Sequence, residues 1–248
     1  MADFTPSLAG PIAKFEQGSK HLNSLDLALA PFGDPNAYVV VRESDRVAGQ
    51  QVWRLDSDVP EIPIDPSLLL GDALHCFRSA LDHLIWQLVL VNGEAPGRSN
   101  AFPISQTQDK YEASNTRMLR GVSPSAKALI DGFQPWQRGY HGLWALQELN
   151  NTDKHRHLYL AVVSVLRTSF VQPGSMNVQP LLSHGPVERS KVLCTLESLE
   201  PDVTFTPGFD VAFGQEDPAA TGASVMGTMR PIQAKVDEVI HSFAQFFS

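Results

Sequence analysis

The sequence predicts an α+β protein with a central helical bundle, a small N-terminal hairpin and C-terminal strands. Three observations lead to this prediction. The middle of the chain repeats apolar residues at helical spacing, two β-branched and aromatic runs within 38–55 flank a polar stretch, and 171–213 is rich in turn residues with short candidate strands. The 248 residues are 43% hydrophobic, enough to bury a substantial core. We expect one domain over 1–248, with a helical core at about 66–160 and a C-terminal helix at 225–247.

The first element is expected to be a helix over Pro11–Ala30. Its apolar residues recur at helical spacing, and Pro31 and Gly33 then close it. Its weak point is Gly18-Ser19, because glycine and serine are poorer helix formers than alanine or leucine.

A hairpin and the central helix should follow. The runs 38–41 and 52–55 are rich in strand-forming residues and are joined by a polar stretch, which predicts two paired strands. The proline-spaced segment 59–66 then leads into the central helix. Asp65 directly precedes Pro66, an order that suits an N-cap residue followed by the first helical position.

Shorter helices are expected between the central helix and residue 153. Proline disfavours helix at the residue before it, so 102–104 (Phe-Pro-Ile) should be extended. One helix should cover 109–119, and a second should start after Ser123, run to Ile130 and stop at Gly132. Leucines at helical spacing over 143–149 mark a third, which reaches a cluster of charged residues.

The C-terminal part should contain strands and a closing helix. The valine-rich stretch 159–170 could continue the preceding helix or become a strand, and strand is favoured beyond about Leu160. Further strands are expected at 192–196 and 203–205. An amphipathic helix should cover 225–247, with a break or a new start near Pro231.

Composition and charge narrow the functional classes. A net charge of -8 gives no global positive field for nucleic acid, so any RNA contact must be local. No apolar run is long enough to span a membrane, and the N-terminus lacks the pattern of a secretory signal. Cys76 and Cys194 do not suggest a disulfide framework. We therefore expect a soluble, cytoplasmic protein without membrane partners.

The central helix carries an unusual polar face. At about 100° per residue, six polar side chains fall within one arc while leucine, phenylalanine and isoleucine fill the other. The six are Asp72, His75, Arg78, Ser79, Asp82 and His83. A plain surface helix would more usually carry Lys and Glu, so this face is the first candidate for chemistry. The chain has no P-loop and no G-x-G-x-x-G pattern, and we expect no cofactor.

Arg78 and His83, five positions apart, resemble the R-x4-6-H motif of HEPN domains. These are helical modules that include metal-independent ribonucleases, in which two motifs commonly meet in a dimer. The resemblance implies a homodimer that binds RNA in a local cleft. Arg78 would stabilise phosphate charge, and His83 would act as general base or acid when the 2′-hydroxyl attacks phosphorus. Ser79 stands where that family often has Asn.

A second cluster covers 150–157, Asn-Asn-Thr-Asp-Lys-His-Arg-His. If this stretch is helical, Asp153 and His157 share a face and His155 points nearly opposite. If it becomes a strand at Lys154, His155 and His157 share a face. Together with the Leu-His-x-x-Arg-Ser-Ala-Leu-Asp-His, Phe-Pro-Ile and Gln-Pro-Trp blocks, this cluster resembles a family of uncharacterised bacterial proteins, many of them from actinobacteria. The resemblance implies that both clusters belong to one module.

These patterns give one leading hypothesis and two alternatives. The leading hypothesis is a metal-independent endoribonuclease or related phosphate enzyme. Its catalytic residues would be Arg78, Asp82, His83 and His155. Its substrate-binding residues would be His75, Ser79, Lys154 and Arg156.

The first alternative is a metal-dependent enzyme, because imidazole and carboxylate together suit Zn²⁺, Mn²⁺ or Fe²⁺. Its ligands would be His75, His83, Asp153 and His157. The second alternative is a noncatalytic interaction or regulatory module. In that case the clusters would be buried polar networks whose charged groups satisfy one another. The simplest structural interpretation of Arg78 is instead an ion pair with Asp82 on the helix surface, one helical turn away.

Overall fold

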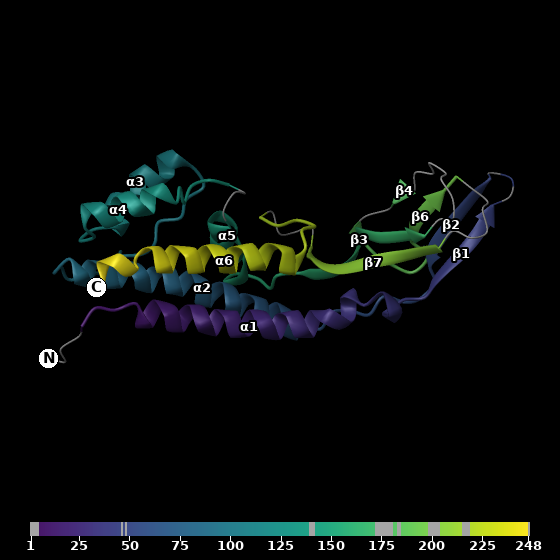
Figure 1. The fold of residues 1–248 in the computed structure, drawn as a ribbon, viewed down its shortest axis with the longest axis horizontal. Coiled ribbons are helices and arrows are strands. Elements are labelled where there is room, and N and C mark those ends of the chain that lie inside the picture. The colour runs from purple at the N-terminus through teal and green to yellow at the C-terminus, as the bar shows by residue number, and fades with distance from the viewer. Residues whose placement is uncertain are drawn as a thin grey trace.

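The computed structural model describes residues 5–45, 47, 49–138, 142–171, 181–182, 185–197, 204–214 and 219–247. The molecule is elongated, with helices toward one end and strands at the other (Figure 1). The prediction of a mixed α+β protein is confirmed. Among the described residues, no helix has the length and apolar character needed to cross a membrane.

Three long helices form the body of the helical end. They are α1 (Ala9–Gly33), α2 (Ile64–Val91) and α6 (Val225–Ser242), which run side by side along the length of the molecule (Figure 1). Their apolar faces meet in one core, in which Leu25, Phe77 and Val236 are fully buried. The apolar residues whose helical spacing predicted these helices are therefore the residues through which the helices pack.

The expected weak point of the first helix is a packing contact instead. Helix α1 continues through Gly18, and a Cβ there would lie only 2.8 Å from two ring carbons of Phe77 on α2. Glycine is needed because the two helices approach closely, so tertiary packing outweighs its low helix propensity. The same helix also runs past Pro31 to Gly33, three residues beyond its predicted end.

The start of α2 differs from the expected N-cap. The helix begins at Ile64, its N-cap residue is Pro63, and no side chain caps it. Asp65 lies in the first turn, where its carboxylate still interacts favourably with the positive end of the helix dipole. The N-cap prediction was therefore wrong by two residues.

The three shorter helices form near their predicted positions, as α3 (Gln108–Met118), α4 (Pro124–Gly132) and α5 (Leu143–Asp153). The hydroxyl of Ser123 accepts a hydrogen bond from the amide of Ala126, which confirms the expected start of α4. Helices α3 and α4 lie at the far helical end (Figure 1), while α5 lies against α2.

The closing helix does not break at its proline. Helix α6 runs from Val225 to Ser242 with Pro231 inside, and a 3-10 turn, η2 (Ala244–Phe246), follows. Proline removes one backbone hydrogen bond, but Ile232, Val236 and Ile240 are at most 1% exposed and hold the helix against the core. Burial of this apolar face explains why the predicted break near Pro231 is absent.

The strands form two antiparallel sheets at the opposite end. One has the order β1-β2-β6-β4 and the other β5-β3-β7. The first contains β1 (Val40–Asp45), β2 (Gln50–Leu55), β6 (Val192–Leu196) and β4 (Leu181–Leu182), and the second contains β5 (Gly185–Pro186), β3 (Leu160–Val171) and β7 (Thr204–Phe213). The predicted hairpin is confirmed, with Val40 opposite Leu55 and Asp45 opposite Gln50.

Strand β7 is longer than expected. The sequence predicted a strand only at 203–205; Val203 lies outside the described residues, and the strand runs from Thr204 to Phe213. Proline and glycine at 207–208 read as a turn in the sequence. Buried Phe209, Val211 and Phe213 keep the strand continuous, because their side chains pack into the cores beneath it.

The buried apolar residues form two hydrophobic clusters. The larger joins α1, α2 and α6 to the start of β3 and the end of β7, and the smaller lies between the sheets. Phe32 and Ile62 pack against both clusters. The region around Ile62, just before α2, is therefore the junction between the helical end and the strand end.

Candidate functional site

Arg78 and Asp82 form a clamp around the backbone of Phe102. The guanidinium lies 2.8 Å from a carboxylate oxygen of Asp82 and donates a hydrogen bond of 2.8 Å to the carbonyl of Phe102. The same carboxylate oxygen accepts a hydrogen bond of 2.9 Å from the amide of Phe102. Burial lowers the pKa of Arg78, and the charge of Asp82 opposes that shift. The predicted ion pair is present, but Arg78 is largely buried rather than on the helix surface, and the pair holds the extended 102–104 segment.

His83 does not face this clamp. Its side chain is exposed, and a Cβ at Gly10 of α1 would lie 3.6 Å from its Nδ1. Five residues along a helix correspond to a rotation of about 140°, so Arg78 and His83 lie at the two edges of the polar face of α2. The joint action of the two residues as a HEPN-like pair stays a prediction.

A different cluster forms where α5 ends against α2. We call it the α2–α5 cluster, and it consists of Asp72, His75, Asp153 and His157. A Cβ at Gly71 would lie 2.5 and 2.6 Å from the two carboxylate oxygens of Asp153, so this carboxylate lies directly over the glycine. Only a residue without a side chain allows so close an approach.

The four groups of the α2–α5 cluster influence one another electrostatically. Burial raises the pKa of Asp153, the negative charge of Asp72 raises it further, and the imidazoles of His157 and His75 partly lower it. Both imidazoles are exposed, and Nε2 of His75 lies 3.4 Å from the hydroxyl of Ser79. The cluster thus places two exposed imidazoles beside a carboxyl group whose pKa is raised.

The other predicted residues of the second cluster lie in a turn. Helix α5 ends at Asp153, while β3 begins only at Leu160, so neither of the two expected continuations, helix or strand, describes residues 154–157. Lys154, His155 and Arg156 are exposed there. Within the part of the chain that the structure describes, no group of three or more His, Cys, Asp or Glu residues is arranged to hold a metal ion. The alternative ligand set His75, His83, Asp153 and His157 is thus not assembled as such a group.

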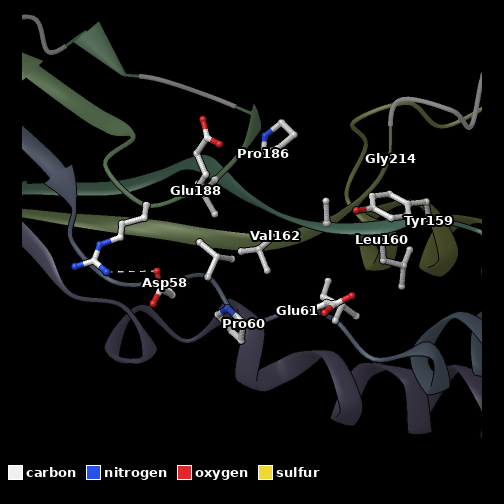
Figure 2. A pocket seen from close by; sticks show the side chains of 14 residues that line it. Asp58, Pro60, Glu61, Tyr159, Leu160, Val162, Pro186, Glu188 and Gly214 are labelled. Atoms are coloured by element: carbon white, nitrogen blue, oxygen red, sulfur yellow. Dashed lines mark ion pairs between the residues drawn. The ribbon is translucent and has the colours of Figure 1, made fainter.

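Sequence reasoning missed a pocket at the junction of the two ends of the molecule, which we call the junction pocket. Its volume is about 760 Å³, and residues 58–62, 159–162, 186–189 and Gly214 line it. Figure 2 shows Asp58, Pro60 and Glu61 on one side, Pro186 and Glu188 on the other, and Val162 of β3 between them. None of the predicted site residues is among its lining residues.

The junction pocket combines apolar walls with an acidic rim. Val59, Ile62, Leu160, Val162 and Val187 supply apolar surface. The guanidinium of Arg189 lies 3.6 Å from Asp58, and it also lies 3.8 Å from Asp56 outside the pocket (Figure 2 draws the first pair). The clearest sequence signal for this pocket was the proline-spaced segment 59–66, whose chain cannot pair as a regular strand.

Two hydrogen bonds hold the backbone at the start of the pocket segment 159–162, and one of them comes from α2. The hydroxyl of Ser67 on α2 donates a hydrogen bond of 2.9 Å to the carbonyl of Leu158, which precedes the pocket residue Tyr159. The amide of Gly214 donates a hydrogen bond of 2.8 Å to the carbonyl of Tyr159. A Cβ at Gly214 would lie 2.6 Å from the Tyr159 ring, so this ring packs directly on the glycine.

Comparison of the chain with protein-family models, with curated proteins and with solved structures finds no match.

Proposed function

We propose that this protein is a noncatalytic binding module whose ligand occupies the junction pocket. The observation that carries the proposal is a cavity of about 760 Å³ with apolar walls, formed where the strands meet the segment that leads into α2. Ligand pockets of about 300–1,000 Å³, mostly apolar with a few polar groups, are typical of small-molecule sites. Their usual place is the boundary between structural units, and the junction pocket has this position.

The chemistry of the pocket favours binding over catalysis. Its described lining residues include no His, Cys, Ser or Lys; besides Arg189, its titratable groups are the carboxylates of Asp58, Glu61 and Glu188 and the phenol of Tyr159, which offer charge and an aromatic face to a ligand. Arg78, the strongest candidate for phosphate binding, is committed to the backbone of Phe102 and to Asp82. The charge of Arg78 therefore stabilises the folded chain and is not available to bind a ligand.

Filling the pocket tests this function. Ala161 is half-buried and lines the cavity, so Ala161→Trp should occupy part of its volume. We expect the wild-type protein to raise the fluorescence of the neutral apolar dye Nile red, and Ala161→Trp to remove most of that signal. Ala113→Trp, at an exposed alanine of α3, is the matched control and should bind dye like the wild type. Equal dye binding by all three folded proteins, checked by circular dichroism, would contradict the proposal.

A metal-independent ribonuclease is the second candidate function, favoured by the position of the Asp153 carboxylate over Gly71 beside two exposed imidazoles. One imidazole of the α2–α5 cluster would take the proton of the 2′-hydroxyl as this oxygen bonds to phosphorus. The other would protonate the leaving 5′-oxygen as its bond to phosphorus breaks, giving a cyclic phosphate and a 5′-hydroxyl. Lys154 lies in the exposed turn beside the cluster and is suited to bind phosphate.

Cleavage of end-labelled RNA in excess EDTA tests the second candidate. If the α2–α5 cluster carries the reaction, His75→Ala and His157→Ala should each abolish cleavage, while the control His241→Ala on α6 keeps it. Loss of cleavage in His83→Ala alone would instead assign the reaction to the HEPN-like pair, which the resemblance places in a dimer. Absence of cleavage by the folded wild type would leave the binding function as the better proposal.

A further inference from the structure

We infer that the ligand of the junction pocket is an organic cation with an apolar body. This inference rests on the proposed binding function and adds the chemical class of the ligand. Three carboxylates line the pocket, those of Asp58, Glu61 and Glu188, against the one guanidinium of Arg189. A ligand that enters a cavity with this surplus of negative charge is favoured if it carries positive charge.

Arg189, the cation among the described lining residues, already pairs with carboxylates. Arg189 pairs with Asp58 and with Asp56, so the two carboxylates without a salt bridge among the described residues are those of Glu61 and Glu188. These two lie on opposite sides of the pocket (Figure 2). A positively charged group between them interacts favourably with both, whereas an anion is repelled by both.

Lys191 is a second cation near the pocket, and its positive charge acts against the negative charge of the lining. Its ammonium donates a hydrogen bond of 2.5 Å to the carbonyl of Pro186, and it is not among the residues that line the cavity. Burial lowers the pKa of Lys191, and the charge of Glu188 opposes the shift. Lys191 therefore offsets part of the charge of Glu188 from outside the cavity.

Tyr159 gives the pocket an aromatic end. Its side chain is 66% exposed although its ring packs on Gly214, and it lies at one end of the cavity in Figure 2. The face of an aromatic ring attracts organic cations, including quaternary ammonium groups. Apolar walls, carboxylates on two sides and an open ring together match a ligand with a cationic head and an apolar body.

Three probes of equal shape test the charge preference by isothermal titration calorimetry at low ionic strength. They are phenylbutyltrimethylammonium, the neutral isostere in which carbon replaces the quaternary nitrogen, and phenylbutanesulfonate. We expect the cation to bind at least fivefold more tightly than the neutral isostere and the sulfonate to bind most weakly. Raising the salt concentration should weaken binding of the cation and leave the neutral isostere unchanged.

Charge-removing variants connect the preference to named residues. Glu61→Gln and Glu188→Gln should each weaken binding of the cation about two- to fivefold, the range expected for exposed ion pairs, and should not affect the neutral isostere. Glu16→Gln, at an exposed position of α1 outside the pocket, removes the same charge and should bind the cation like the wild type.

The possible outcomes separate this inference from the binding function on which it rests. Equal binding of cation and neutral isostere, or tighter binding of the sulfonate, overturns the cationic ligand class but supports the pocket as a binding site. Loss of cation affinity in Glu16→Gln equal to that in Glu61→Gln also overturns it, because the charge effect would not come from the pocket. If no probe binds and Ala161→Trp leaves Nile red binding unchanged, the binding function itself fails.

Discussion

Replacing Arg78 by Met tests whether the clamp around Phe102 is a structural element. Methionine keeps an apolar stem of similar length but removes the donors to the Phe102 carbonyl and to Asp82. A buried carbonyl that loses a charged donor costs about 1.5–3 kcal/mol. The Asp82 side chain is 36% exposed, so loss of its ion pair adds only about 0.5–1 kcal/mol. The expected loss of unfolding free energy is therefore about 2–4 kcal/mol.

Urea and thermal denaturation followed by circular dichroism measure this loss. For a chain of this length, about 3 kcal/mol corresponds to a fall in Tm of roughly 6–12 °C. Arg117→Met, at an exposed position of α3, is the matched control and should change stability by no more than about 0.5 kcal/mol. If Arg78→Met is destabilised no more than this control, the clamp has no structural role and the reasoning that removed Arg78 from phosphate binding is refuted.

The close contacts of two glycines and one carboxyl group give three further predictions. Gly18→Ala should lower the unfolding free energy by about 1–2 kcal/mol in urea denaturation, because the new methyl group meets the Phe77 ring. In the control Gly132→Ala the new methyl group meets nothing within 4 Å, so this variant should be neutral or stabilising. A larger loss in Gly132→Ala than in Gly18→Ala would contradict the close contact between Gly18 and Phe77. Gly71→Ala should lower the unfolding free energy by about 1–2 kcal/mol, because it displaces the carboxylate of Asp153. The loss should be smaller in the Asp153→Ala background, and an equal loss there would show that Gly71 and Asp153 are not in contact. The pKa of Asp153 is raised in the folded state, so its contribution to stability is present below the unfolded pKa of about 3.8 and is lost as pH rises through the folded value. Asp153→Asn should therefore gain stability relative to the wild type as pH rises through that window, and a constant difference across pH would contradict the shift.

Local signals in the sequence were sufficient to locate most helices and the hairpin. Ser123 before Pro124 gives a capped start for α4 through interactions within one turn. The runs that form β1 and β2 are close in sequence, so their pairing needs no distant partner. The predicted weak point at Gly18 and the predicted break at Pro231 were wrong, because both predictions used local helix propensity alone. Packing against the neighbouring helices keeps both helices continuous at these residues.

The site was harder to predict because its parts come from distant segments. The helical arc correctly placed Arg78 and Asp82 together, but periodicity cannot show that the backbone of Phe102 covers them. The contact between Gly71 and Asp153 joins positions on two helices that are far apart in the chain. The junction pocket needs four such segments at once, and no spacing within any one of them reveals it.

The overall charge of the chain bears differently on the two functional proposals. A net charge of -8 opposes the approach of RNA, so a ribonuclease would have to gather phosphate through the few cations of the turn after α5. The same acidity attracts an organic cation, and the carboxylates of Glu61 and Glu188 concentrate that attraction at the mouth of an apolar cavity. The charge distribution therefore favours the binding function, because its ligand is drawn by the whole surface as well as by the pocket.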